Sequence, residues 1–307
     1  MEKEIYDSII IGAGPAGLTA GIYLSRAKMQ VLILDSGMAG GQMVLTHEVA
    51  NYPGFESISG YMLAMNMKKQ AEKFGCEIKT NISIIEYIID DKIKKIKLKD
   101  GKELKARSII IATGGRSRKV GAEGENDFAG RGISYCATCD GDFFQDREII
   151  VIGGGNSALE EAVSLTTYAS KVTIVHQFDQ WQAFDSAIEE MEANPKIDYI
   201  MESKVVEFKG SQSLESVIIE NQKTKERYEK KIDGVFIFIG YVPNTEEFKG
   251  LIKLNSYGEI IIDKQFQTNL PGVFAAGDSI EKRYRQITTA VADGTNAALN
   301  ALEYLNQ

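Results

Sequence analysis

The chain has 307 residues, which is enough for about two domains of ordinary size. Apolar residues make up 44% of it and charged residues 25%, values that are typical of folded globular proteins and exclude wholesale disorder. The net charge of −8 argues against a general binder of nucleic acid or of anionic membranes. Its 29 glycines and 5 prolines suit an α/β protein with tight turns between strands and helices.

An apolar stretch near the N-terminus, Ile9 to Leu24, is not expected to be a signal peptide or a membrane span. Glu2 and Glu4 stand where a signal peptide carries positive charge, and no apolar run reaches the ~18 residues that a bilayer requires. The three cysteines are an odd number, which does not suit an extracellular disulfide framework. We therefore expect a cytoplasmic protein with no membrane partner and no nucleic-acid partner.

A strand–turn–helix–strand pattern occurs twice in the sequence. The first copy comprises a strand from Glu4 to Ile11, the turn Gly12–Gly17, a helix from Leu18 to Ala27 and a strand from Gln30 to Leu34. The second comprises a strand from Glu148 to Ile152, the turn Gly153–Ala158, a helix from Leu159 to Tyr168 and a strand from Lys171 to His176. Two such units predict an α/β fold with two doubly wound, Rossmann-like nucleotide-binding domains.

The segments between these units also follow a duplicated pattern. Alternating charged stretches at 83–107 and 204–231 predict hairpin strands, the first with its turn at Asp100-Gly101. Buried strands, Ser108 to Ala112 and Gly234 to Ile239, come next in each case. A strand over 272–276 and a terminal helix from about Thr288 to Leu305 are expected near the end, with short crossovers near 115–118 and 240–244.

The first glycine turn indicates a dinucleotide site. Gly12 permits the sharp bend, Gly14 lets the backbone approach a pyrophosphate, and Gly17 allows the helix to pack closely on the strand. The N-terminus of the helix then faces the anion with free N–H groups. Asp35, at the end of the second strand, can accept hydrogen bonds from a ribose.

The second glycine turn leaves two interpretations open. It keeps Gly153, Gly155 and Ala158, and the fingerprint tolerates alanine at the third position. NADP binding normally needs cations after the second strand, but residues 177–182 include no Arg or Lys. NAD binding prefers an acid at the strand end, but Asp179 lies some residues past it. This turn is either a functional pyridine-nucleotide site or a retained scaffold whose site has decayed.

The motif Cys136-Ala137-Thr138-Cys139-Asp140 is either a redox dithiol or half of a zinc site. Zinc would need two further ligands, and neither Cys76 nor the isolated histidines, His47 and His176, show ligand spacing. We therefore favour the dithiol and expect no metal. Asp140 is a candidate proton donor and acceptor, or alternatively a helix N-cap. Cys76 is expected to be a buried structural thiol.

In combination, the motifs resemble the bacterial low-molecular-weight thioredoxin reductases over essentially the whole chain. The motifs that carry the resemblance are, in chain order, GAGPAG at 12–17, GGQ at 40–42, NYPG at 51–54, ATG at 112–114, CATCD at 136–140, GGGNSA at 153–158, GVFAAGD at 272–278 and YRQ at 284–286. The resemblance implies a homodimeric flavoprotein in which both chain ends build an FAD domain, residues 1–115 and 244–307. A redox-disulfide domain, residues 116–243, is inserted between them.

The resemblance also implies roles for individual residues. Cys136 would attack thioredoxin, Cys139 would face the flavin and Asp140 would manage protons. The implied FAD contacts are Gly12, Gly14, Pro15, Ala16, Gly17, Asp35, Ser36, Gly40, Gly41, Gln42, Asn51, Thr113, Gly114, Gly277, Asp278, Arg285, Gln286 and Ile287.

One departure from the family pattern bears on the electron donor. Typical members carry three arginines after the second unit that hold the phosphate of NADPH, whereas Gln177, Phe178 and Gln182 stand at those positions here. This resembles the ferredoxin-dependent flavin thioredoxin reductases, which implies reduced ferredoxin as donor. The alternatives are an NADPH- or NADH-dependent thioredoxin reductase and a flavin-binding sensor without turnover.

Docking of an acidic ferredoxin would need a local basic patch on this acidic chain. Two clusters are candidates, Arg116 with Arg118 and Lys119, and Lys282 with Arg283 and Arg285. Each is otherwise an ordinary solvated surface.

Overall fold

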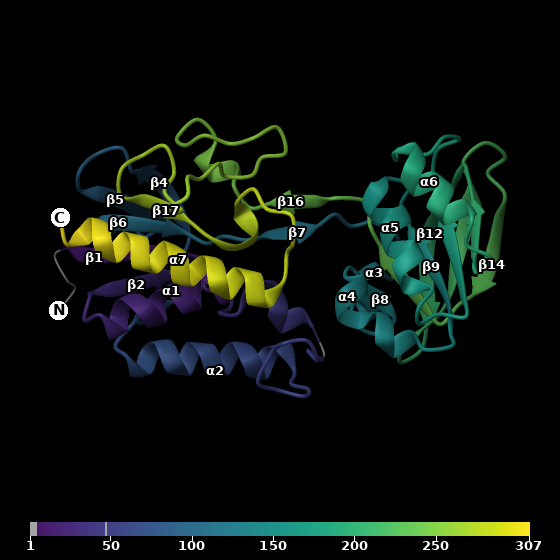
Figure 1. Cartoon of the computed structure of the whole chain (residues 1–307), viewed down its shortest axis with the longest axis horizontal. Helices are drawn as coiled ribbons and strands as arrows, with labels where there is room; N and C mark the ends of the chain where they lie inside the picture. The colour runs from purple at the N-terminus through teal and green to yellow at the C-terminus, as the bar shows by residue number, and fades with distance from the viewer. Residues whose placement is uncertain (1–4, 47) are drawn as a thin grey trace. The chain divides into compact units, whose positions relative to one another are not determined.

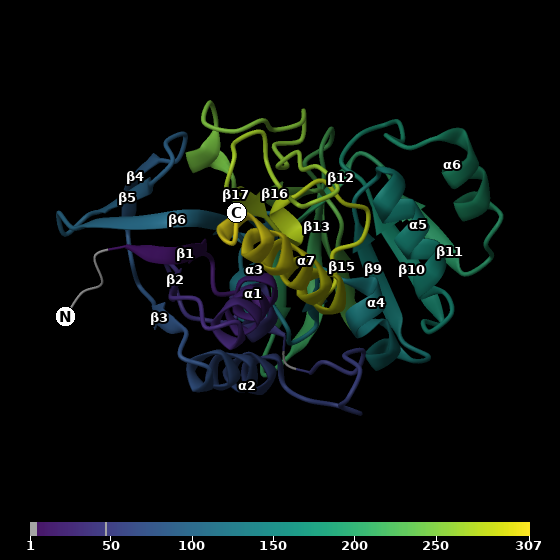
Figure 2. The ribbon, with the colours of Figure 1, turned by 60° about the vertical axis from the view of Figure 1, so that its left-hand side comes forward.

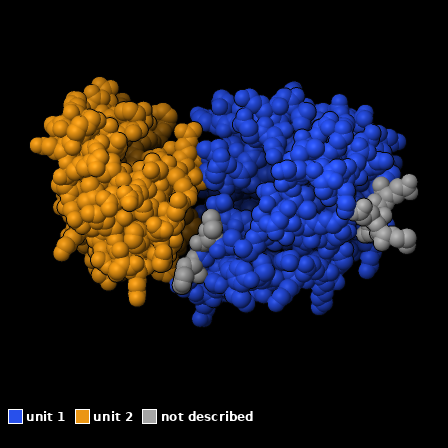
Figure 3. All heavy atoms as spheres, turned by 180° about the vertical axis from the view of Figure 1, so that it is seen from behind, with its two compact units in different colours: residues 1–116, 242–307 blue, residues 117–241 orange. Residues whose placement is uncertain are grey.

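The computed structural model describes residues 5–46 and 48–307, so Glu2, Glu4 and His47 lie outside the described part of the chain. The chain forms two compact units, drawn in blue and orange in Figure 3. Unit 1 comprises residues 1–116 and 242–307, and unit 2 comprises residues 117–241. The expected domain limits, 115/116 and 243/244, lie one and two residues from these.

Unit 1 is built on a seven-stranded mixed sheet in the order β3-β2-β1-β6-β5-β4, with β17 also paired to β6. Its strands are β1 (Tyr6–Ile11), β2 (Val31–Leu34), β3 (Glu77–Lys79), β4 (Ile84–Ile88), β5 (Lys94–Leu98), β6 (Glu103–Ile111) and β17 (Val273–Ala275). Strands β2, β1, β17 and the second half of β6 are parallel and almost fully buried, which is why they read as largely apolar runs.

Three long helices cover this sheet: α1 (Pro15–Arg26), α2 (Gly60–Lys73) and α7 (Ile287–Leu305). Figures 1 and 2 show α1 and α7 side by side, and α1 also packs against α2. Short 3-10 turns are η1 (Gly41–Leu45), η3 (Glu246–Phe248) and η4 (Gly277–Ser279). Helix α1 follows the first glycine turn, and α7 follows the last motif. Because these two helices pack against each other, the two ends of the chain share one core.

The alternating stretch expected at 83–107 and the buried strand expected at 108–112 are joined by one continuous strand. This strand, β6, pairs antiparallel with β5 in its first half and parallel with β1 in its second. Ala106 pairs with both Lys94 and Tyr6, and no glycine or proline interrupts the strand. Helix α1 also begins three residues before the expected Leu18, because Pro15 suits the first helical position.

Unit 2 holds a five-stranded parallel sheet in the order β11-β10-β9-β15-β8 and a three-stranded antiparallel sheet β12-β13-β14. The strands are β8 (Ile133–Ser134), β9 (Glu148–Ile152), β10 (Lys171–Val175), β11 (Ile197–Ile200), β12 (Ser203–Gly210), β13 (Leu214–Asn221), β14 (Arg227–Lys231) and β15 (Gly234–Ile237). The helices are α3 (Glu125–Phe128), α4 (Ala137–Asp140), η2 (Gly141–Phe144), α5 (Asn156–Leu165) and α6 (Asp185–Glu192).

The chain passes between the units twice, and the two passages pair with each other. They form the two-stranded sheet of β7 (Gly115–Ser117) and β16 (Tyr241–Pro243), labelled in Figure 1. Over the described residues, none of the helices combines the length and the apolar character that crossing a bilayer would require.

Candidate functional site

The first glycine turn is shaped by two contacts that only glycine allows. Gly12 has φ +106°, and a Cβ on it would lie 2.2 Å from the carbonyl oxygen of Ala112. A Cβ on Gly17 would lie 1.9 Å from the carbonyl oxygen of Gly12. Gly14 caps α1 in an extended conformation without a side-chain hydrogen bond. The first N–H groups of α1 therefore remain available to an anion.

The acid at the end of β2 is anchored to this turn. Asp35 accepts a hydrogen bond from the Ala13 N–H at 2.6 Å through Oδ2 and another from the Gly37 N–H at 2.8 Å through Oδ1. The neighbouring Ser36 is exposed. Asp35 thus lies beside the glycine turn, where its lone pairs can also accept from a ribose hydroxyl.

The second predicted motif, at 40–42, packs onto the first turn. The Gly40 N–H donates to the Ala13 carbonyl at 2.7 Å, and a Cβ on Gly41 would lie 3.1 Å from the Cα of Gly14. Gly40 itself has φ +124°. Gln42 is exposed at the start of η1. Glycines at both positions keep this segment against the N-terminus of α1.

Segments from the end of the chain complete the same region. Gly277 has φ +75°, and a Cβ on it would lie 2.9 Å from the Cβ of Ala16, so the start of η4 with Asp278 lies against α1. Gln286 caps α7, whose first residue is Ile287, in a reciprocal capping box with Thr289. Its side chain also accepts from Asn51 Nδ2 at 3.4 Å, although 235 residues separate the two.

Thr113 and Gly114 follow β6 at its carboxyl end. Asn244 holds both, with its Nδ2 donating to the Thr113 carbonyl at 3.0 Å and its N–H donating to the Gly114 carbonyl at 2.9 Å. The Thr113 hydroxyl is buried and has no hydrogen-bond partner within the described residues. A buried hydroxyl without a partner, at the carboxyl edge of a parallel sheet and beside an uncapped helix, fits a bound dinucleotide.

Two acids of unit 1, Glu259 and Asp293, were not singled out from the sequence, although both pair with residues that were. Glu259 forms an ion pair with Arg285, while Lys282 pairs with Asp293 at 2.5 Å and lies 3.9 Å from Asp278. Only the four-residue spacing of Asp278 and Lys282 could have signalled one of these contacts. Lys282 and Arg285 of the second expected basic cluster are therefore engaged in ion pairs with acids of unit 1.

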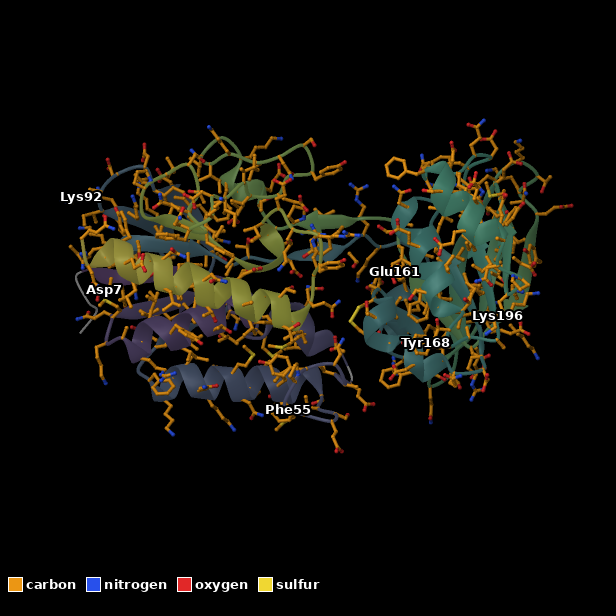
Figure 4. The ribbon with its side chains drawn as sticks, viewed as in Figure 1. Asp7, Phe55, Lys92, Glu161, Tyr168 and Lys196 are labelled. Atoms are coloured by element: carbon orange, nitrogen blue, oxygen red, sulfur yellow. A yellow bond between two sulfur atoms is a disulfide. The ribbon has the colours of Figure 1, made fainter. Side chains whose placement is uncertain are left out.

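The cysteine pair of unit 2 is a disulfide, visible as the yellow bond in Figure 4. The Cα atoms of Cys136 and Cys139 are 5.3 Å apart, because Cys136 caps α4 and Cys139 lies within its single turn. Among the described residues, no group of three or more His, Cys, Asp or Glu side chains is arranged to hold a metal ion. The third cysteine, Cys76, is buried in unit 1, and its thiol donates to the Glu77 carbonyl at 3.8 Å.

Asp140 ends α4 and makes no capping hydrogen bond with its side chain. Its Oδ2 instead accepts from the hydroxyl of Ser134, 2.5 Å away at the end of β8. Burial raises the pKa of Asp140, and the charge of Asp142 acts in the same direction, while the hydrogen bond from Ser134 opposes them. A carboxyl group with a raised pKa beside a dithiol is suited to proton transfer.

The second glycine turn is contacted by the loop that follows β10. A Cβ on Gly154 would lie 2.2 Å from the ring of His176, and the Gln182 N–H donates to the Gly154 carbonyl at 2.8 Å. His176 stacks on Trp181, with ring centroids 5.4 Å apart. Gln177, Phe178, Asp179 and Gln182 are exposed on this loop.

The charges nearest to this loop do not supply the missing cations. Lys223 is paired with Glu202, and Asp179 also acts on its charge. A phosphate group placed beside Gln177, Phe178 and Gln182 would therefore contact neutral side chains, with the acids Asp179 and Glu202 nearby.

Comparison with known proteins identifies the family. The family of pyridine nucleotide-disulphide oxidoreductases matches residues 6–294. A thioredoxin reductase of Peptoclostridium acidaminophilum is 46% identical over 99% of this chain and 98% of its own length. One of Bacillus subtilis is 45% identical over 100% of this chain and 96% of its own. The crystal structure of a thioredoxin reductase of Streptococcus pyogenes has a TM-score of 0.94 at 42% identity, covering 98% of both chains.

Enzymes of this family use FAD, and FAD is the cofactor of this chain. The chain therefore belongs to the pyridine nucleotide-disulphide oxidoreductases and, within them, is homologous to the low-molecular-weight bacterial thioredoxin reductases.

Proposed function

We propose that this chain reduces the disulfide of thioredoxin with its own Cys136–Cys139 dithiol. The observation that carries this proposal is the disulfide at the start of α4, with the partly buried carboxyl group of Asp140 in the same helical turn. In this reaction the Cys136 thiolate attacks one sulfur of the thioredoxin disulfide, and a mixed disulfide forms. Cys139 then attacks Cys136, so that two electrons and two protons pass to thioredoxin.

We assign the FAD site to unit 1. Gly12, Gly14 and Gly17, with Pro15 and Ala16 of α1, would hold the pyrophosphate, and Asp35 with Ser36 the ribose. Gly40, Gly41, Gln42, Asn51, Thr113, Gly114, Gly277, Asp278, Arg285, Gln286 and Ile287 would line the rest of the cofactor. FAD supplies the two-electron chemistry that returns the oxidised Cys136–Cys139 pair to the dithiol.

A pyridine nucleotide is the donor that the comparisons favour. The matched family is named for it, and the glycines of the second turn lead directly into the N-terminus of α5, which Gly155 caps, as such a site requires. Because positions 177, 178 and 182 carry no cation, we expect this site to distinguish NADPH poorly from NADH.

Reduced ferredoxin is the second candidate, and one observation favours it. The neutral loop of Gln177, Phe178 and Gln182 removes the cations that a 2′-phosphate needs. Electron transfer from a ferredoxin near −400 mV to thioredoxin near −270 mV would release about 6 kcal/mol for two electrons. Its docking patch would be Arg116, Arg118 and Lys119, since Arg116 and Lys119 donate to the neutral amide oxygens of Asn244 and Asn126.

The donor is tested by anaerobic titration of the purified yellow protein. NADPH, NADH and chemically reduced ferredoxin are added separately, and bleaching of the flavin is followed over time. Rapid bleaching by either nucleotide assigns the donor to the turn Gly153–Ala158. Rapid bleaching by ferredoxin alone, with a rate that falls steeply with added salt, assigns it to the basic patch.

We also propose that the chain acts as a homodimer in the cytoplasm, as its family resemblance implies. Tyr61 and Met62 of α2 are about half exposed, which is unusual for two adjacent large apolar side chains on one helix. Light scattering coupled to size-exclusion chromatography should give twice the mass of the 33.9 kDa chain. The mass of a single chain at micromolar concentration would contradict the dimer.

A further inference from the structure

The hydroxyl group of Ser134 connects Asp140 to the backbone of the first redox cysteine. Ser134 is 5% exposed at the end of β8, two residues before Cys136. Its Oγ lies 2.5 Å from Asp140 Oδ2, 3.1 Å from the Cys136 nitrogen and 3.3 Å from the Cys136 carbonyl oxygen. One buried oxygen atom therefore meets three polar groups of the CATCD segment.

Asp140 can keep its hydrogen bond to Ser134 in either protonation state. A serine hydroxyl has one proton to donate and two lone pairs to accept with. When Asp140 is ionised, Ser134 donates its proton to Oδ2 and accepts from the Cys136 N–H. When Asp140 is protonated, the carboxyl group can donate to Ser134 Oγ across the same 2.5 Å, and the hydroxyl can donate to the Cys136 carbonyl instead.

Retaining hydrogen bonds in both states matters because Asp140 is partly buried, and burial raises its pKa. A buried carboxyl group that loses its only partner in one protonation state pays the full cost of desolvation in that state. In the proposed reaction, the acid must nevertheless change state during each cycle. A hydroxyl that reverses its donor direction removes that penalty without moving any heavy atom.

The other ionisable groups around Asp140 come from its own turn and from the helix packed against it. Asp142 of η2 acts on it directly, and α5, which contacts α4, carries Glu160 and Glu161, the latter labelled in Figure 4. The remaining groups are the thiols of Cys136 and Cys139 once the disulfide is reduced. All of these are acids, so Ser134 is the contact that favours the ionised form of Asp140.

We propose that Ser134 is a positioning residue that keeps Asp140 hydrogen-bonded in both protonation states and so lets it give a proton to, and recover one from, the reduced dithiol. In this exchange the Asp140 carboxyl O–H bond breaks and an S–H bond forms on a cysteine thiolate, and the reverse occurs when the thiol is deprotonated. This inference rests on the dithiol chemistry proposed above.

The test measures the thiolate directly and requires neither thioredoxin nor an electron donor. The holoprotein is reduced with dithiothreitol, freed of excess reductant under anaerobic conditions, and alkylated with iodoacetamide across a pH series. Only the thiolate reacts, so the rate against pH reports the ionisations that govern the dithiol. Each ionisation gives one limb of this profile, meaning one range of pH over which the rate changes. The limb that is missing in the Asp140→Asn variant belongs to Asp140.

The Ser134→Ala variant should move that limb to higher pH by about one unit, the order of one hydrogen bond to a charged group. Ser134→Thr keeps the hydroxyl and should return the limb to its wild-type position. Bound flavin and circular dichroism are compared throughout, so that a misfolded variant is recognised, and Thr138→Ala, an exposed position of the same turn, is the matched control.

Three results would overturn the inference: a limb unmoved in Ser134→Ala, a shift that Ser134→Thr shares with Ser134→Ala, or a wild-type profile that Asp140→Asn leaves unchanged. Failure of the proposed function is distinguishable from these. It would appear as a protein whose alkylation profile shifts as expected but whose wild-type form does not reduce thioredoxin with any of the three donors.

Discussion

A Cβ on Gly294 of α7 would lie 2.2 Å from the carbonyl oxygen of Ala16 in α1. Helices from opposite ends of the chain therefore meet backbone to backbone at this point. The contact fixes the position of α7 beside the glycine turn, and with it the positions of Asp278 and Gln286, which precede the helix. A single hydrogen atom as side chain is what permits that approach.

The Gly294→Ala variant should lower stability by about 1–3 kcal/mol and release FAD, because the added methyl group forces α7 away from α1. Thermal unfolding and the flavin-to-protein absorbance ratio measure the two effects. Asn296→Ala, at an exposed position of the same helix, serves as the control and should change neither. Full flavin occupancy in Gly294→Ala would show that this contact does not shape the cofactor site.

Substituting either redox cysteine should abolish thioredoxin reduction and leave the flavin in place. Cys136→Ser and Cys139→Ser each remove one sulfur that must form or resolve the mixed disulfide, whereas unit 1 carries the proposed FAD site. Cys76→Ala is the matched control, because Cys76 is buried in unit 1 and should not take part. Thioredoxin reduction at the wild-type rate by Cys136→Ser would exclude the proposed reaction.

Restoring positive charge to the loop after β10 should create affinity for NADPH. The triple variant with Gln177→Arg, Phe178→Arg and Gln182→Arg offers the 2′-phosphate up to three charge-assisted hydrogen bonds, so its affinity should rise about tenfold or more. Affinity for NADH, which lacks that phosphate, should stay unchanged.

Titration of flavin bleaching with both nucleotides measures this effect, and Gln212→Arg, exposed elsewhere on unit 2, controls for a general gain of charge. An equal gain for NADH and NADPH would contradict a specific phosphate contact. No gain for either nucleotide would mean that the loop does not face a bound nucleotide.

His176 should titrate below its ordinary pKa of about 6.5. Burial lowers the pKa of His176, and the hydrogen bond that its Nε2 donates to the Gln180 carbonyl at 3.0 Å only partly offsets this effect. Because the folded protein holds this proton more weakly than the unfolded chain does, the stabilisation is present above pH 6.5 and is lost as the pH falls through the folded pKa.

Trp181, the only tryptophan of the chain, stacks on His176 and reports its charge through fluorescence. A pH titration of this emission should show a midpoint below 6.5 that is missing in His176→Asn. A midpoint above 6.5 would mean that the imidazole is not buried as described. Retention of the transition in His176→Asn would assign it to another group.

The sequence alone was sufficient for features that depend on neighbouring residues. The two strand–turn–helix units are visible because glycines at fixed spacing interrupt apolar runs, and a buried parallel strand such as 148–152 needs no alternation. The pairing of Cys136 with Cys139 follows from their short separation. Features of this kind depend on residues close together in the sequence, so they can be predicted without knowledge of the fold.

The tertiary structure alone decided which distant residues meet. No local pattern brings Asn51 to Gln286 or pairs Glu259 with Arg285, since these contacts depend on how the helices cover the sheet. The same holds for Ser134, which is an unremarkable serine in sequence until the fold buries it between Asp140 and Cys136. Long-range packing sets the burial and the partners of such polar groups, and these determine their chemistry.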